Sequence, residues 1–163
     1  MEILDLVKVL KSNELLLAEL YHECQRLFPD HKADFEELQS EEEGHAFLVD
    51  QIYQDIKENP DEWKPGKLSL VSAQNVNSRI RETLKEIREG KASSRYAITF
   101  AMSMELSMSE KNFAQILVTE NPAFKMIFKS LDEGFVHHYS VLQKIEKQIF
   151  KPGKMGFDDL NRI

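Results

Sequence analysis

Five carboxylate and imidazole side chains lie at positions where this sequence otherwise selects apolar residues. Glu42 and His45 are three residues apart, a spacing that puts both on one face of a helix. Glu14, Glu105 and His138 are far from them in the sequence. Carboxylate oxygens and neutral imidazole nitrogens are common ligands of iron, manganese and zinc. These residue types predict a metal site that several helices must assemble.

Each of the five side chains belongs to a line of apolar residues that recur at steps of three and four. The lines are Leu10, Glu14, Leu17; Leu38, Glu42, His45, Val49; Ala101, Glu105, Met108; and Leu131, Phe135, His138, Leu142. Such steps place residues on one helical face, which predicts that the polar members point into the core. An isolated carboxylate is costly there unless it is paired, protonated or bound to a metal.

Four long helices and one shorter helix are predicted to carry these lines. Their expected bounds are residues 3–28, 31–58, 72–90, 94–120 and 122–151, with an exposed loop over 59–70. Short links make the first two and the last two long helices antiparallel hairpins, and a connection of about thirty residues joins the hairpins. The sequence predicts one all-α domain over residues 1–150, followed by a C-terminal tail over 151–163.

In these motifs the chain resembles the rubrerythrins and other ferritin-like di-iron carboxylate proteins over most of its length. That family brings together a Glu from each of two helices and a Glu-x-x-His pair from each of two others. Glu14 and Glu105 match the single glutamates, Glu42 with His45 matches the first pair, and His138 matches the histidine of the second pair. The resemblance implies a ferritin-like four-helix bundle whose long crossover contains a short helix.

The chain departs from the family pattern at Phe135, three residues before His138, where the family has Glu. Phe can neither bind a metal nor offset its charge. Three outcomes are open: a two-metal site short of one ligand, a single metal held mainly by the four candidates on the first three long helices, or a site without metal. Asp132 and Glu133 are predicted to face away from His138 and not to replace the missing ligand.

The resemblance implies a metal-binding oxidoreductase of the peroxidase or ferroxidase type that acts on iron, peroxide or dioxygen. Its cofactor would be one or two iron ions, with manganese and zinc as other candidates. The alternative is a non-catalytic ferritin-like structural or interaction module that has lost full di-iron chemistry. Cys24 is the single cysteine, so the chain has no rubredoxin-like module and electrons would come from an external donor.

Neighbours of the candidate ligands have weaker predicted roles. Tyr21 and Asn112 are expected to pack against the site or support its ligands. Glu41 and Glu43 lie about 100° to either side of Glu42 on the helix, so they are expected to face solvent or a rim and to have no role in the site.

Composition excludes several other classes of function. The formal net charge of −7 opposes binding to nucleic acid, and no basic cluster compensates for it. The sequence has no apolar run long enough for a membrane span and no start typical of a signal peptide. These features predict a cytoplasmic protein without a membrane or nucleic-acid partner, and self-association into a homodimer is compatible with them.

Overall fold

Helices account for most of the chain in the computed structural model, which describes residues 2–111 and 113–150. The helices are α1 (Glu2–Leu27), α2 (Lys32–Glu58), α3 (Leu70–Arg88), α4 (Ser94–Lys111), α5 (Phe113–Ile116) and α6 (Pro122–Ile149), with 3-10 turns at Pro29–His31 and Pro60–Glu62. Two short strands, β1 (Trp63–Pro65) and β2 (Leu117–Thr119), pair antiparallel. The predicted helical class is confirmed. The predicted tail over 151–163 lies outside the described residues.

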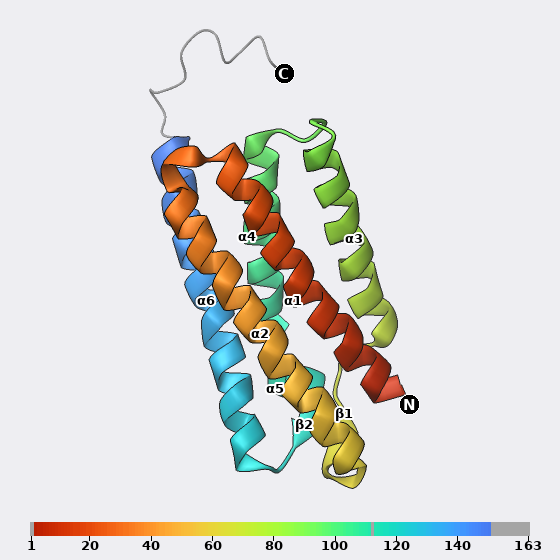
Figure 1. Ribbon diagram of the computed structural model, residues 1–163. Coiled ribbons are helices and arrows are strands. Elements are labelled where there is room, and N and C mark those ends of the chain that lie inside the picture. The colour runs from red at the N-terminus through yellow and green to blue at the C-terminus, as the bar shows by residue number, and fades with distance from the viewer. Residues whose placement is uncertain (1, 112, 151–163) are drawn as a thin grey trace, which may run out of the picture.

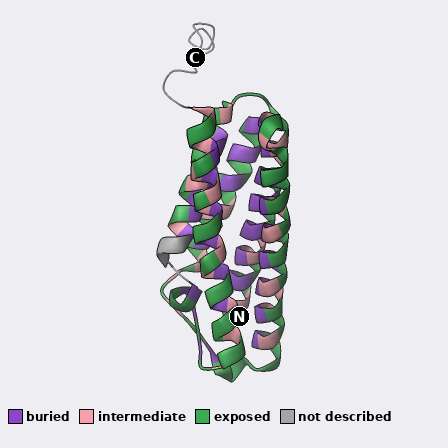
Figure 2. Cartoon of the chain, turned by 90° about the vertical axis from the view of Figure 1, so that its left-hand side faces the viewer, coloured by how far each residue is buried: buried purple, intermediate pink, exposed green. Residues whose placement is uncertain are grey.

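The long helices lie side by side along one axis (Figure 1). α1 and α2 form one antiparallel hairpin, and α4 and α6 form the other. α3 lies beside α1 and runs in the same direction, so the connection between the hairpins spans the length of the molecule. Buried residues line the sides of the helices that face one another, as Figure 2 shows in purple. None of the described helices combines the length and apolar content that a bilayer span requires.

Local signals explain where several helices begin and end. The Asn121 side chain accepts a hydrogen bond of 3.0 Å from the Ala123 N–H at the start of α6. Gly90 has a φ of 70° just after α3, a conformation that glycine adopts without a steric penalty. Ser69 caps α3, because its Oγ accepts from the Ser72 N–H at 3.1 Å, so the helix begins at Leu70 and not at the expected residue 72.

The prediction of a helix up to position 120 is wrong, because Leu117–Thr119, which follows α5, is a strand. Its side chains alternate between buried and exposed. A helix here would break the pairing with Trp63–Pro65. The β-branched Val118 and Thr119 also favour an extended backbone.

The segment before α3 also contains more regular structure and more tertiary contacts than predicted. Trp63 is buried, packs edge to face with Phe124 and Phe128, and donates from Nε1 to Asp55 at 2.7 Å. Gly66, which comes directly after the strand, packs against the Gln115 backbone. An added Cβ at Gly66 would lie 2.1 Å from the Gln115 carbonyl oxygen. The prediction of an exposed loop over residues 59–70 is therefore wrong for the strand and its aromatic contacts.

The core consists of two apolar clusters with a polar layer between them. The Tyr21 cluster includes Leu17, Leu38, Met104 and Leu142, and the Phe135 cluster includes Leu10, Val49 and Met108. Along each long helix, the polar side chain stands where one cluster gives way to the other. The polar layer consists of Glu14, Glu42, His45, Glu105 and His138.

Candidate metal centre

The polar layer gathers all five candidate ligands in the interior of the bundle. α1 supplies Glu14, α2 supplies Glu42 and His45, α4 supplies Glu105 and α6 supplies His138. Four of these residues are at most 1% exposed, and His45 is 8% exposed. The structure thus brings together residues separated by up to 124 positions (138 − 14). That they bind a metal stays a prediction.

Glu42 lies at the centre of the layer and contacts both histidines. Its Oε2 is 3.2 Å from His45 Nδ1, and its Oε1 is 2.9 Å from His138 Nδ1. The two imidazole rings stack with centroids 5.1 Å apart. The Nδ1 atom of each ring therefore faces the same carboxylate.

The other two carboxylates lie on either side of this group. Glu14 Oε2 is 3.7 Å from His45 Nδ1, and Glu105 Oε1 is 3.4 Å from His138 Nδ1. The hydroxyl of the fully buried Tyr21 donates a hydrogen bond to Glu105 Oε1, which agrees with its predicted supporting role. Asn112, which was given the same role, lies outside the described residues.

Four buried side-chain atoms in the described part of the chain have no hydrogen-bond partner, and all belong to the polar layer. They are Glu14 Oε2, Glu42 Oε1, Glu105 Oε2 and His138 Nδ1. His138 Nδ1 and Glu42 Oε1 are close, but their alignment does not meet hydrogen-bond geometry. A buried polar atom without a partner costs about 1–3 kcal/mol. A cation bound among these atoms would remove that cost.

Three of the five residues meet the distance requirement for one shared ion. Each of Glu42, His45 and His138 offers a ligand atom, and these atoms all lie within 4.8 Å of one another. Carboxylate oxygen and imidazole nitrogen form a donor set suited to a divalent transition metal. This buried group could hold a metal ion.

Three residues of the polar layer, Glu42, His45 and His138, hold protons more tightly than the same groups do in water. Burial, reinforced by the Glu105 carboxylate, raises the pKa of Glu42 to about 8. Burial alone would lower the pKa of each histidine, but the negative charge of the adjacent carboxylates outweighs it. The pKa of His45 rises to about 9 beside Glu14 and Glu42, and that of His138 to about 11 beside Glu105 and Glu42. Protons thus balance the carboxylates when no metal is bound.

Comparisons of the chain with models of protein families, with curated proteins and with solved structures find no match. The geometry of the polar layer is therefore the basis of the function proposed below.

Glu41 contacts the layer although the sequence analysis gave it no role. Its Oε2 lies 2.8 Å from His138 Nε2 and 4.0 Å from His137 Nε2, and its side chain is 37% exposed. Glu41 does lie at a rim, as expected, and it also contacts His138, which was not predicted. Its partner is on another helix, so spacing along α2 contains no signal for this contact.

Phe135 fills the core beside the layer, where the family pattern has a carboxylate. Its side chain is fully buried, with its ring centroid 5.8 Å from that of His45. Asp132 accepts a hydrogen bond of 2.8 Å from the Phe113 N–H, and Glu133 pairs with Lys129. Both acidic side chains make these contacts outside the polar layer.

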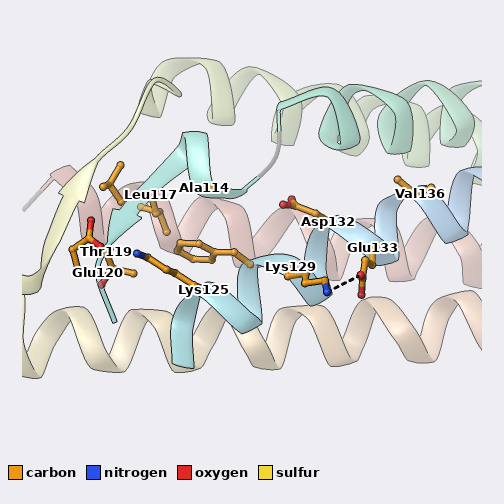
Figure 3. Close-up of a pocket in the computed structure, with 11 residues that line it drawn as sticks. Ala114, Leu117, Thr119, Glu120, Lys125, Lys129, Asp132, Glu133 and Val136 are labelled. Atoms are coloured by element: carbon orange, nitrogen blue, oxygen red, sulfur yellow. Dashed lines mark hydrogen bonds and ion pairs between the residues drawn. The ribbon is translucent and has the colours of Figure 1, made fainter. Parts of the chain in front are cut away.

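A surface pocket of about 720 Å³ lies between α6 and the segment that carries α5 and β2 (Figure 3). Its walls are largely apolar, with Leu117 and Phe128 among them, and Lys129 reaches toward Glu133 at its edge. No residue of the polar layer lines it. The pocket is separate from the candidate metal centre.

Gly134 on α6 has no side chain, so the His45 ring can occupy the space beside it. A Cβ at this position would lie 2.4 Å from both Cε1 and Nε2 of His45. Gly134→Ala is expected to displace His45 from Glu42 and to weaken metal binding by about tenfold or more. Metal titration by isothermal calorimetry measures this loss.

Gly44→Ala is the matched control, because an added Cβ there meets nothing within 4 Å. It is expected to stabilise α2 by about 0.5–1 kcal/mol through helix propensity and to leave metal affinity unchanged. Equal metal affinities in the two variants would show that the space at Gly134 is not needed for the site.

Proposed function

We propose that the polar layer binds one divalent metal ion, with iron as the first candidate and manganese or zinc as the others. The observation that carries the proposal is the set of four buried atoms without hydrogen-bond partners, all on predicted ligands. Glu42, His45 and His138 would hold the ion, and Glu14 and Glu105 would complete its surroundings. A single ion accounts for the layer best, because the Phe135 ring stands where a further carboxylate would be needed.

The fold is proposed to be a ferritin-like four-helix bundle of the rubrerythrin kind. Two antiparallel hairpins and a crossover with its own helix support this assignment. The five polar residues also support the ferritin-like assignment, because they lie at one level of the interior and every long helix contributes at least one of them. A ferritin-like protein builds its metal site at this position, between facing helices.

On this basis the protein is proposed to be an oxidoreductase of the peroxidase or ferroxidase type, acting on iron, peroxide or dioxygen. Bound iron would supply the change of oxidation state that such chemistry requires. The chain's own residues would bind the ion and shield it from water. Glu42 bridges the two histidines, and Tyr21 orients Glu105 through a hydrogen bond. The apolar clusters limit the access of water to the layer. Cys24 is buried, and burial raises the pKa of its thiol to about 12, so the proposed electron donor is external.

The alternative function is a non-catalytic ferritin-like module. Phe135 favours it, and so do the raised pKa values of the two histidines, because protons can balance the buried carboxylates without a metal. Such a protein would keep the polar layer as an internal ion-pair network and would act through its surface.

Metal content decides between these functions. Protein purified without chelators is expected to contain about one metal ion per chain by elemental mass spectrometry, and a Glu42→Gln, His45→Gln variant is expected to contain almost none. Glu43→Ala is the control, since Glu43 is exposed and bonds only within its own helix to Gln39. Wild-type protein without metal, even after anaerobic reconstitution with Fe(II), would leave the non-catalytic module as the function.

A further inference from the structure

The two ring nitrogens of His138 have different surroundings. Nδ1 faces the interior, 2.9 Å from Glu42 Oε1 and 3.4 Å from Glu105 Oε1. Nε2 faces the seam between α2 and α6, where Glu41 Oε2 lies 2.8 Å away at hydrogen-bond geometry. An ionised carboxylate can only accept a hydrogen bond, so Nε2 carries a proton.

A neutral imidazole has one N–H, so a proton kept on Nε2 leaves a lone pair on Nδ1. Without metal, Nδ1 faces the Glu42 and Glu105 carboxylates and carries the second proton of a cationic ring, and a bound ion would take the place of that proton. A metal ligand needs a free lone pair directed at the ion. The geometry of His138 therefore meets this requirement only while something outside the layer holds its Nε2 proton.

We propose that Glu41 is a positioning residue for the metal centre, which fixes the His138 ring with Nε2–H bonded to Glu41 and with Nδ1, the nitrogen that would bind the ion, turned toward the buried carboxylates. This inference rests on the proposed metal-binding function. Carboxylates that accept from the distal nitrogen of a histidine ligand fix its ring orientation and strengthen it as a ligand. Glu41 does so from α2, whereas the carboxylate missing at Phe135 would have come from the same helix as His138.

The two histidines are thus held by different means. His45 is confined by the space at Gly134, where an added Cβ would approach its Nε2 to 2.4 Å. His138 is held by the hydrogen bond that its Nε2–H donates to Glu41, a side chain that is partly in water. Loss of Glu41 is therefore expected to affect His138 selectively and to leave the packing of the layer in place.

Titration with Co(II) under anaerobic conditions tests the proposal, with visible absorption as the signature of the ligands and chelator competition as the measure of affinity. Glu41→Ala is expected to weaken Co(II) binding by about tenfold to a hundredfold and to change the visible spectrum. Glu41→Gln is expected to restore both, because the amide oxygen still accepts from Nε2–H. Glu43→Ala, on the exposed side of the same turn, should match wild type. Wild-type affinity and spectrum in Glu41→Ala would overturn the proposal.

A second measurement separates this proposal from the metal-binding function itself. In metal-free protein labelled with ¹⁵N-histidine, His138 is expected to show an Nε2–H proton that is protected from exchange with water, and this protection is lost in Glu41→Ala and kept in Glu41→Gln. Wild-type protein that binds no Co(II) would contradict the proposed function, and the Nε2–H signal would then still report on Glu41. The absence of a proton on Nε2 in wild-type protein would overturn the role of Glu41 whatever the metal result.

Discussion

A Phe135→Glu variant is expected to bind a second equivalent of metal and to depend on metal for its stability. The change adds the carboxylate that the resemblance to the rubrerythrins calls for, three residues before His138. The same change removes a fully buried ring that packs against His45 and Phe113, so the metal-free variant is expected to be less stable than wild type. Truncation of a buried Phe costs about 3–5 kcal/mol, and an unpaired buried carboxylate adds to that cost. Elemental mass spectrometry and thermal unfolding with and without Mn(II) measure the two effects.

Phe135→Leu is the matched control, because it removes the ring without adding a ligand. It is expected to lower stability by less than the Glu variant, by about 1–1.5 kcal/mol, and to keep the metal stoichiometry of wild type. If Phe135→Glu binds no more metal than wild type and metal does not raise its melting temperature, then Phe135 is not what limits the site to one ion.

The metal-free protein is expected to lose stability as pH rises from about 6.5 to 9. The folded-state pKa values of His45 and His138, about 9 and about 11, lie above the usual 6.5 of histidine. Their contribution is complete below pH 6.5 and declines as pH rises through the folded values. Glu42 acts in the same direction, because its pKa rises from 4.5 to about 8 and the folded state keeps a proton that the unfolded chain has released.

Bound metal should reverse this trend, since the ion replaces protons on the same ligands and binds more tightly as pH rises. The melting temperature with chelator should therefore fall between pH 6.5 and 9, while the increase caused by metal should grow. Calorimetry at several pH values, with Glu42→Gln as a variant that lacks one of the titrating groups, provides the measurement. A metal-free melting temperature that rises over this range would contradict the pKa directions on which the prediction depends.

The buried faces of the long helices could be predicted from the sequence because each is a periodic local signal. Glu14 and Glu105 interrupt otherwise apolar lines, and the structure places both in the core. Helix starts were also readable where a cap has a local partner, as at Asn121. These features depend on residues within one or two turns of each other.

Features that depend on two distant segments could not be predicted in the same way. Leu117–Thr119 forms a strand because Trp63–Pro65 pairs with it, and neither segment alone has enough alternating residues to indicate a sheet. Glu41 meets His138 across a sequence separation of 97 residues, at a distance that depends on how α2 and α6 pack. Phe135 could be recognised from the sequence as a departure from the family pattern. Its packing against His45 and Phe113 could not, because those residues lie on other elements.

The polar layer between the two apolar clusters also limits how far the long helices can shift along one another. Sliding one long helix along its neighbours by a turn, about 5.4 Å, would carry Glu14, Glu105 or His138 into the Tyr21 or Phe135 cluster. A buried charge without its partner is costly, so misaligned packings are penalised even though the apolar clusters alone would tolerate them. The axial register of the helices is thus encoded by the same five side chains that are proposed to bind the metal.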